Sequence, residues 1–266
     1  MRLDVYLTEK GIAPSRQRAQ NMIKNGEVFV NGKCIEKASY EVAAADVLSV
    51  DNAGESNRYV SRGGLKLEAA LRRFAVDVQG KTVVDIGAST GGFSDCLLQY
   101  GAETVFAVDV GDSQLHPTIH DHPHVVVMDH CNARYLKKTM FPALPDMAVM
   151  DVSFISQTMI LPVIRDILSE NGCLISLIKP QFEVGPAKLS KRGIVTDERS
   201  RIEAIRQVVS SACQAGLFPS KIMTSPIHGG DGNVEYLLCS YCAPHAVLKT
   251  DEQSIRRYLF QSEEIP

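Results

Sequence analysis

Residues 83–93, VVDIGASTGGF, constrain the fold more than any other segment of this chain. A short apolar run leads into a loop of small residues, and the apolar start of a helix follows. Gly87 and Gly91 can adopt backbone angles closed to other residues, so a ligand can lie directly against the main chain. A doubly wound α/β sheet builds its nucleotide pocket in this way, at the carboxyl end of its first strand. The segment therefore predicts a Rossmann-like sheet with a ligand site at that edge.

The same loop narrows the choice of ligand. It lacks the Gly-Lys-Ser/Thr ending of a phosphate-binding P-loop, and Ser89 occupies the second glycine position of the dinucleotide motif. Asp85 stands at the head of the loop, and Asp109 closes the next predicted strand, where an acid can hold ribose hydroxyls. A carboxylate where a pyrophosphate would otherwise lie favours a cationic ligand without phosphate. S-adenosylmethionine meets that requirement.

The rest of the large domain alternates between strand and helix. The last two strands are joined without an obvious helix, which predicts a seven-stranded parallel sheet with one antiparallel strand. The spacing of Leu65, Ala69 and Phe74 predicts a helix before the first strand. We expect strands at 82–86, 104–109, 124–128, 147–151, 173–179, 221–226 and 234–241, and helices at 93–99, 155–168 and 197–215.

The beginning of the chain forms a separate small α+β unit, which Leu3, Val5 and Leu7 open. Ser15 can cap a helix, and Asn31-Gly32 is typical of a two-residue hairpin turn. Polar turn-forming residues then make a linker. We expect a helix at 16–24, strands at 28–30, 34–37 and 47–50, a linker at 51–57, and domains at 1–57 and 58–266.

Composition excludes several classes of protein. The chain of 266 residues is 45% hydrophobic and 22% charged, with a net charge of −3, as in ordinary globular proteins. Without a global basic field, any nucleic-acid site must be a local patch. No apolar run is long enough to span a bilayer, and no signal peptide opens the sequence. We therefore expect a cytoplasmic protein with reduced cysteines and no membrane partner, and leave its oligomeric state open.

Basic side chains gather in three places that could contact RNA. The first is the helix and hairpin of the small unit, where a solvated helix face is an equally good explanation on charge alone. The second is segment 58–73, which carries a net charge of +4, and the third is the long irregular loop 180–196. The predicted RNA contacts are Arg16, Arg18, Lys24, Lys33, Arg62, Lys188, Lys191 and Arg192.

Two groups of potential metal ligands have simpler explanations. Cys239 and Cys242 fall in a predicted strand, where positions three apart point to opposite faces. Five of the seven histidines lie within fifteen residues, but this segment contains two prolines and is typical of a solvated loop. A metal site needs fixed geometry and supporting partners. We therefore predict no metal.

Four charged residues should meet at one edge of the sheet: Lys66, Asp151, Lys179 and Glu235. Individually, a lysine at a strand end commonly points to water and an aspartate there commonly caps a helix. Together, two cations and two carboxylates form a mutually satisfied cluster, and partial burial can leave one lysine neutral. A neutral lysine can accept a proton from a sugar hydroxyl. The set therefore favours methylation of a ribose 2′-oxygen.

Other methyl acceptors need other groups. Exocyclic base nitrogens are commonly handled by an Asn/Asp-Pro-Pro-Tyr strand end, whereas this chain has Asp151-Val-Ser-Phe. Carbon 5 of cytosine needs a cysteine nucleophile, commonly after proline, and the sequence contains no Pro-Cys pair. Sugar methylation is favoured over base methylation.

These motifs resemble known families. Segments 2–4, 15–16, 26–32 and 46–48 resemble the S4 RNA-binding fold, and the four charged residues resemble the Lys-Asp-Lys-Glu tetrad of FtsJ-like ribose 2′-O-methyltransferases. Their combination resembles the TlyA family of ribosomal RNA methyltransferases, which also carry the name haemolysin. Segments 61–63, 85–93, 132–134, 151–156, 179–185 and 232–236 extend the resemblance over nearly the whole chain.

The resemblance implies roles for single residues. Lys179 would be the base, Asp151 would tune it, and Lys66 and Glu235 would position the sugar. The substrate would be a cytidine of large-subunit RNA or, in some members, small-subunit RNA. A non-enzymatic RNA-binding assembly factor and a haemolysin remain alternatives. The implied S-adenosylmethionine contacts are Asp85, Gly87, Ala88, Ser89, Gly91, Gly92, Phe93, Asp109 and Asp129.

Overall fold

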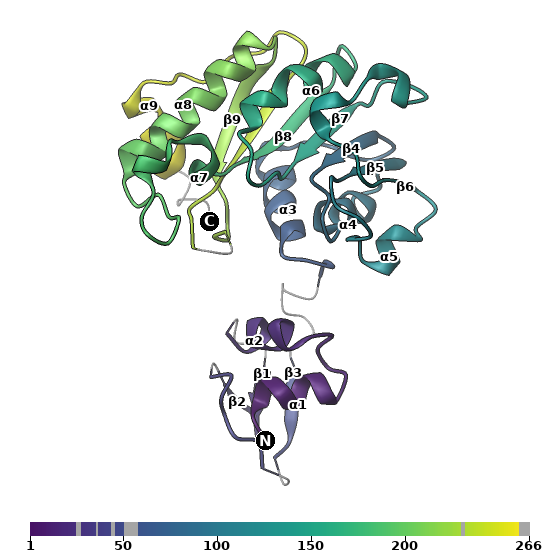
Figure 1. Cartoon of the computed structure of the whole chain (residues 1–266), viewed down its shortest axis with the longest axis vertical. Helices are drawn as coiled ribbons and strands as arrows, with labels where there is room; N and C mark the ends of the chain where they lie inside the picture. The colour runs from purple at the N-terminus through teal and green to yellow at the C-terminus, as the bar shows by residue number, and fades with distance from the viewer. Residues whose placement is uncertain (25–27, 36, 44–45, 51–57, 230–231, 261–266) are drawn as a thin grey trace. The chain divides into compact units, whose positions relative to one another are not determined.

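The computed structural model describes residues 1–24, 28–35, 37–43, 46–50, 58–229 and 232–260 (Figure 1). Contacts divide the chain into two compact units, Met1–Tyr59 and Val60–Pro266. Each unit has its own hydrophobic core. The strand expected over 34–37 is wrong in its bounds, because the structure has a strand only at Lys33–Cys34, with residue 36 outside the described residues. The linker 51–57 lies wholly outside the described residues.

The small unit packs two helices on a three-stranded antiparallel sheet of order β2-β1-β3. Asn31 and Gly32 have φ angles of 52° and 76°, so both residues are left-handed, as the tight hairpin turn requires. The first helix was not expected. Leu3 and Leu7 lie four residues apart, so both reach the core from one helix face. The elements are α1 (Leu3–Glu9), α2 (Arg16–Lys24), β1 (Val28–Val30), β2 (Lys33–Cys34) and β3 (Leu48–Val50).

A buried carboxylate joins the two helices of the small unit. Asp4 accepts hydrogen bonds from Arg2 at 3.0 Å, Arg16 at 2.9 Å and Gln20 at 2.8 Å. The bond from Arg2 and the other donors hold the pKa of Asp4 well below its usual range. The Arg16 side chain remains about half exposed, at 55%. Asp4 therefore fixes the direction of one predicted RNA contact.

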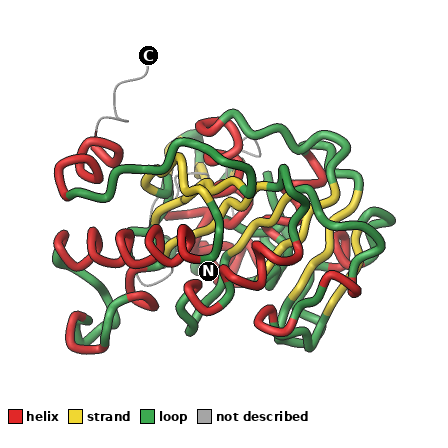
Figure 2. Tube along the Cα trace, turned by 90° about the horizontal axis from the view of Figure 1, so that it is seen from above, coloured by secondary structure: helices red, strands yellow, loops and turns green. Residues whose placement is uncertain are grey.

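The large unit is built on a seven-stranded sheet of order β6-β5-β4-β7-β8-β10-β9. Within the described residues, β10 alone runs antiparallel to its neighbours, so the predicted topology is confirmed. Helices lie on both sides of the sheet (Figure 2). The strands are β4 (Thr82–Ile86), β5 (Thr104–Val108), β6 (Val125–Met128), β7 (Met147–Met150), β8 (Cys173–Ile178), β9 (Phe218–Thr224) and β10 (Tyr236–Tyr241).

Strand alternation decides what each face of the sheet buries. Val84 and Ile86 of β4 join the large apolar core, whereas Asp85 between them faces the other side, where Ser94 of α4 lies. On that side α3 packs against α4. The helices are α3 (Gly63–Phe74), α4 (Gly92–Gln99), α5 (Pro117–His120), α6 (Leu161–Ile167), α7 (Pro180–Glu183), α8 (Glu198–Gln214) and α9 (Glu252–Phe260).

Two expected elements differ in extent. The helix expected over 155–168 is wrong in its first half, where a 3-10 turn, Gln157–Met159, precedes α6. Pro162 lacks a backbone N–H, so it fits the first turn of a new helix better than the interior of a long one. The strand expected over 221–226 begins earlier, at Phe218, and ends at Thr224. Within the described residues, no helix is long and apolar enough to cross a membrane.

Candidate active site

The charged residues of interest stand directly beside strand ends. Asp109 follows β5, Asp151 follows β7, Lys179 follows β8, and Glu235 precedes β10. Because β10 is antiparallel to β8, its beginning lies at the edge where the parallel strands end. Lys66 reaches the same edge from the first turns of α3. Sheet topology thus gathers residues that are up to 169 positions apart.

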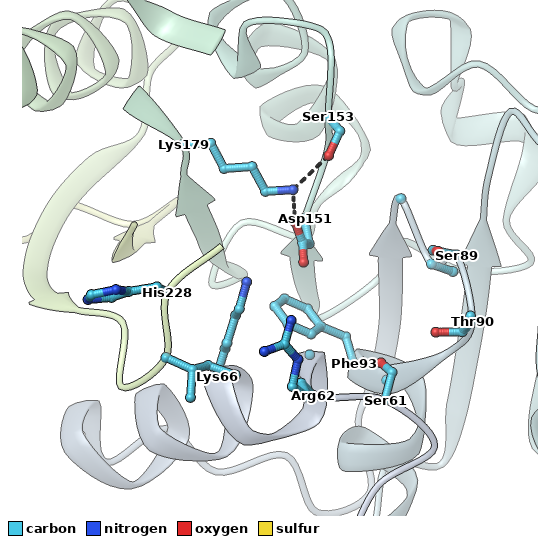
Figure 3. A pocket seen from close by; sticks show the side chains of 15 residues that line it. Ser61, Arg62, Lys66, Ser89, Thr90, Phe93, Asp151, Ser153, Lys179 and His228 are labelled. Carbon is cyan, nitrogen blue, oxygen red and sulfur yellow. Dashed lines mark hydrogen bonds and ion pairs between the residues drawn. The ribbon is translucent and has the colours of Figure 1, made fainter. Parts of the chain in front are cut away.

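The tetrad forms two ion pairs. Lys66 Nζ lies 2.5 Å from Glu235 Oε2, with side-chain exposures of only 10% and 2%. Lys179 Nζ lies 2.6 Å from Asp151 Oδ1, with side chains 12% and 21% exposed (Figure 3). Lys66, Asp151 and Lys179 line one cavity, and Lys179 and Glu235 line an adjoining hollow. The structure therefore brings all four predicted residues together.

Two cavities meet beside these pairs. The first, which we call the tetrad cavity, has a volume of about 290 Å³ and contains the two lysines and Asp151. The second, the Asp109 cavity, has a volume of about 480 Å³ and extends along the ends of β5 and β7. Both are lined by Gly87, Ser89, Asp151 and Ser153. The lining of the tetrad cavity also includes Ser61, Arg62, Gly63, Ala88, Thr90, Gly92, Phe93, Ile227 and His228.

The glycine loop leaves the main chain bare where the cavities meet. Gly87 has a φ of 80°, and a Cβ there would lie 2.5 Å from the carbonyl oxygen of Asp151. Asp109 holds the loop because its carboxylate accepts from the N–H groups of Ser89 and Gly111, both at 2.8 Å. Gly91 caps α4 and faces the α5 region rather than either cavity. Gly87 therefore lets the loop pass close to the main chain after β7, and it lines both cavities.

Besides Gly91, two predicted cofactor contacts lie away from both cavity linings. Asp85 is wholly buried and accepts a hydrogen bond from Ser94 Oγ at 2.7 Å, and burial raises its pKa to about 7. Asp129 accepts from the N–H of Ser113 at 3.2 Å. The expectation that Asp85 faces the ligand differs from this geometry, because strand alternation directs its side chain beneath α4.

Sequence reasoning missed several lining residues. Ser153 accepts a hydrogen bond from Lys179 Nζ at 2.8 Å (Figure 3). Its position two residues after Asp151 was the available signal. Ser61, just before α3, and His228, in the segment before β10, also line the tetrad cavity. Ser61 belongs to segment 61–63 of the family resemblance, whereas no local pattern marks His228. The structure thus adds hydroxyl and imidazole groups to the predicted charges.

The segment after Lys179 is tied to the segment after β7. Glu183 of α7 is buried and accepts from Ser156 Oγ at 2.5 Å and from the N–H of Gln157 at 3.0 Å. Burial raises the pKa of this carboxyl. The ring of Phe182 lies 5.2 Å from that of Phe154, which has a φ of 63° and is 92% exposed. These contacts connect the segment that follows Lys179 to the segment that follows Asp151.

Farther along, the same loop carries the predicted basic residues. Lys191 and Arg192 are exposed, and Lys188 pairs with Glu203 of α8. Asn233 is buried and anchors the loop, because it accepts from the N–H of Val195 and donates to the carbonyl of Gly193. The anchored loop can thus present Lys191 and Arg192 beside the sheet edge that carries the tetrad.

The candidate metal ligands lie elsewhere. Cys239 in β10 and Cys242 beyond it are buried free thiols. In the histidine-rich segment, His116 caps α5, and its ring nitrogen accepts from the N–H of Thr118. Among the described residues, no group of three or more His, Cys, Asp or Glu side chains is arranged to hold a metal ion.

Comparison with known proteins identifies the family. Residues 59–241 match an FtsJ-like methyltransferase domain, and residues 1–48 match an S4 domain. The chain is 41% identical to Hemolysin A of Brachyspira hyodysenteriae, over 89% of this chain and 98% of that protein. It is 38% identical to the 16S/23S rRNA (cytidine-2′-O)-methyltransferase TlyA of Mycobacterium tuberculosis, over 89% and 88% of the two chains.

A solved structure from Lactococcus lactis is similar to this chain. Its TM-score is 0.71 at 42% identity, covering 77% of this chain and 99% of that one. A second structure, from Streptococcus thermophilus, has a TM-score of 0.73 at 38% identity and covers 93% and 90% of the two chains. From these matches and the S4-plus-FtsJ architecture, the chain belongs to the TlyA family.

Proposed function

We propose that this protein transfers a methyl group from S-adenosylmethionine to the ribose 2′-oxygen of a cytidine in ribosomal RNA. The observation that carries the proposal is the pair of ion pairs, Lys66–Glu235 and Lys179–Asp151, beside the glycine loop of a methyltransferase sheet. Relatives named 16S/23S and 23S rRNA (cytidine-2′-O)-methyltransferase support the choice of acceptor.

The Asp109 cavity fits S-adenosylmethionine. Its described lining contains two carboxylates, Asp109 and Asp151, and no lysine or arginine, which suits a cation and disfavours a phosphate. Asp109 would hold ribose hydroxyls, while Ala133 and Ile160 offer apolar surface to the adenine. The bare main chain at Gly87 would lie beside the sulfonium. S-adenosylmethionine bound there supplies an electrophilic methyl group.

The tetrad cavity suits the acceptor ribose because it shares a wall with the Asp109 cavity. Lys179 Nζ would take the proton from the 2′-hydroxyl, and Asp151, at 2.6 Å, would stabilise the ammonium that forms. Lys66 is held by Glu235 and would donate to sugar oxygens. The protein's main contribution is alignment, with the reacting atoms roughly 3–3.5 Å apart before transfer.

Basic and aromatic side chains would hold the RNA. Arg62 is exposed on the rim of the tetrad cavity, and the loop that carries Lys188, Lys191 and Arg192 would contact phosphates around a flipped nucleotide. The exposed ring of Phe154 offers a surface on which a base can stack. In the small unit, folded RNA would be contacted by Arg16, Arg18, Lys24 and Lys33. The partner is ribosomal RNA in subunits or assembly particles in the cytoplasm.

The test is a methylation assay on ribosomal subunits from cells that lack this gene. The full-length protein and S-adenosylmethionine should produce 2′-O-methylcytidine in large-subunit RNA, detected by nucleoside mass spectrometry, with small-subunit RNA assayed in parallel. A methylated base would identify a base methyltransferase instead. Tight RNA binding without methylation would identify an assembly factor, and leakage of liposomes by the pure protein would favour a haemolysin.

A further inference from the structure

The two lysines of the tetrad differ in their partners. Lys66 pairs with one carboxylate oxygen of the buried Glu235. Lys179 has two partners: it forms an ion pair with Asp151 Oδ1 at 2.6 Å and donates a hydrogen bond to Ser153 Oγ at 2.8 Å. Ser153 is exposed and lines both the tetrad cavity and the Asp109 cavity. Its hydroxyl therefore lies at the boundary between the two proposed substrate sites.

Two polar partners limit the direction in which the lone pair of a neutral lysine nitrogen can point. The Lys179 nitrogen has one bond to carbon and three further tetrahedral positions, which all carry protons in the ammonium form. When the amine is neutral, two N–H groups remain; Ser153 accepts one of them, and the negative charge of Asp151 attracts the other. The lone pair is then left in the third position. A lysine with a single acceptor would be free to rotate its lone pair away from the substrate.

We propose that Ser153 is a positioning residue, which works with Asp151 to direct the lone pair of Lys179 at the ribose 2′-hydroxyl. This inference rests on the proposed function. In the step, the 2′-oxygen forms a bond to the methyl carbon as the bond from that carbon to sulfur breaks, and its electron pair stays on sulfur. The hydroxyl proton moves to Lys179 Nζ, which becomes an ammonium held by Asp151 and Ser153.

Local backbone geometry explains why the serine can do this. Phe154 takes a left-handed conformation with a φ of 63°, so the chain turns directly after Ser153. The turn directs Phe154 outward, at 92% exposure, and leaves Ser153 beside Lys179. The contacts of Phe154 with Phe182 and of Ser156 with Glu183 then fix the same segment against α7. The Ser153 hydroxyl therefore lies in a turn that contacts with α7 stabilise.

The test measures single-turnover methyl transfer and steady-state kinetics with the full-length protein. Ser153→Ala should lower the rate about tenfold to a hundredfold, because the amine loses one of its two orienting partners. Ser153→Thr keeps the hydroxyl and should stay within a few-fold of wild type. Ser153 is exposed, so neither change removes core packing. Ser210→Ala, on the exposed side of α8, is the matched control.

The kinetic constants separate positioning from a general structural role. Ser153→Ala should lower kcat about tenfold or more, while KM for ribosomal subunits and RNA affinity change less than about twofold. The other charged or titratable groups that line the cavities around Lys179 are unchanged in this variant, namely Arg62, Lys66, Asp151, His228 and Glu235.

An equal loss of kcat and RNA affinity, an unaltered rate, or an equal loss in Ser153→Thr would overturn the assignment. Failure of the proposed function has a different signature. In that case the wild-type protein itself would bind RNA and leave no 2′-O-methylribose, so no comparison of variants would arise.

Discussion

At the scale of single residues, the two lysines at the catalytic edge share a charge but differ in surroundings. Lys66 is paired with a carboxylate that is almost fully buried, and Lys179 faces a partly exposed carboxylate and a hydroxyl. A cation held by a buried acid is suited to binding oxygen atoms. A lysine with mixed partners at a cavity wall is better suited to exchanging a proton.

Replacing Lys179 tests this division. Lys179→Met should lower the methyl-transfer rate at least about a hundredfold, because it removes the proposed base. Affinity for ribosomal RNA should stay close to that of wild type, as measured by filter binding. Lys137→Met, on an exposed turn, controls for loss of one charge. Equal loss of binding and transfer would show that Lys179 holds the RNA rather than the proton.

Asp85 gives a prediction about stability at the same scale. Its pKa is raised from 3.8 to about 7 in the folded protein, so the folded state binds a proton more tightly than the unfolded state. Its contribution to stability is therefore greatest below pH 3.8 and declines as pH rises to about 7. By linkage the decline is up to about 4 kcal/mol.

Asp85→Asn removes this titration and keeps an acceptor for Ser94. The stability of the variant relative to wild type should rise between pH 4 and pH 8, measured by urea unfolding at a series of pH values. Asp166→Asn, on the surface of α6, should show no comparable trend. A constant difference between Asp85→Asn and wild type would mean that the buried carboxyl is ionised at all these pH values.

At the scale of elements, the site depends on two segments that follow neighbouring strands. The segment after β7 carries Asp151 and Ser153, and the segment after β8 carries Lys179. Three contacts join them in order: the Lys179 contacts, the Phe154–Phe182 rings, and the bonds from Ser156 and Gln157 to Glu183. Because Glu183 is only four residues from Lys179, the last contact should influence the first.

Glu183→Ala tests that coupling. It leaves Ser156 and the N–H of Gln157 without their acceptor, which should cost about 1–3 kcal/mol. Hydrogen exchange in segments 153–160 and 180–196 should become faster, and the methyl-transfer rate should fall with it. Glu170→Ala changes an exposed glutamate outside both segments. Unchanged exchange in both segments would show that Glu183 does not brace the site.

At the scale of the whole molecule, the two units divide the proposed work. The S4 unit has a small core and basic side chains, and the large unit contains both cavities. RNA affinity and chemistry should therefore be separable by mutation. Arg16 is unsuitable for this test, because it also pairs with the buried Asp4. We therefore use Arg18 and Lys33 for this test.

The double variant Arg18→Glu with Lys33→Glu should raise KM for ribosomal subunits at least about tenfold with little change in kcat. Each lost phosphate contact should reduce the slope of log affinity against log salt by about 1. Lys137→Glu with Lys249→Glu gives the same change in net charge at exposed positions of the large unit. A fall in kcat with an unchanged KM would place the small unit in the chemical step.

The sequence by itself predicted the fold class, the places of most strands along the chain and, through the family resemblance, the four residues of the tetrad, whereas the order of the strands in the sheet came from the structure. Strand alternation, the hairpin at Asn31-Gly32 and the polar residues at strand ends are local patterns, so they are visible in one dimension. The first helix was missed because Leu3, Val5 and Leu7 also fit the alternation of a strand. The break before α6 was missed because Pro162 lies inside an apolar run.

Only the tertiary structure decided the pairing and direction of the charged groups. The family resemblance grouped Lys179 with Asp151 and Lys66 with Glu235 by role, but the two contacts themselves form only once the sheet brings the strand ends together. The burial of Asp85 beneath α4 and the contact of Ser153 with Lys179 have the same origin. Side-chain direction at a site depends on the elements that pack around it, and packing brings together residues that sequence keeps apart.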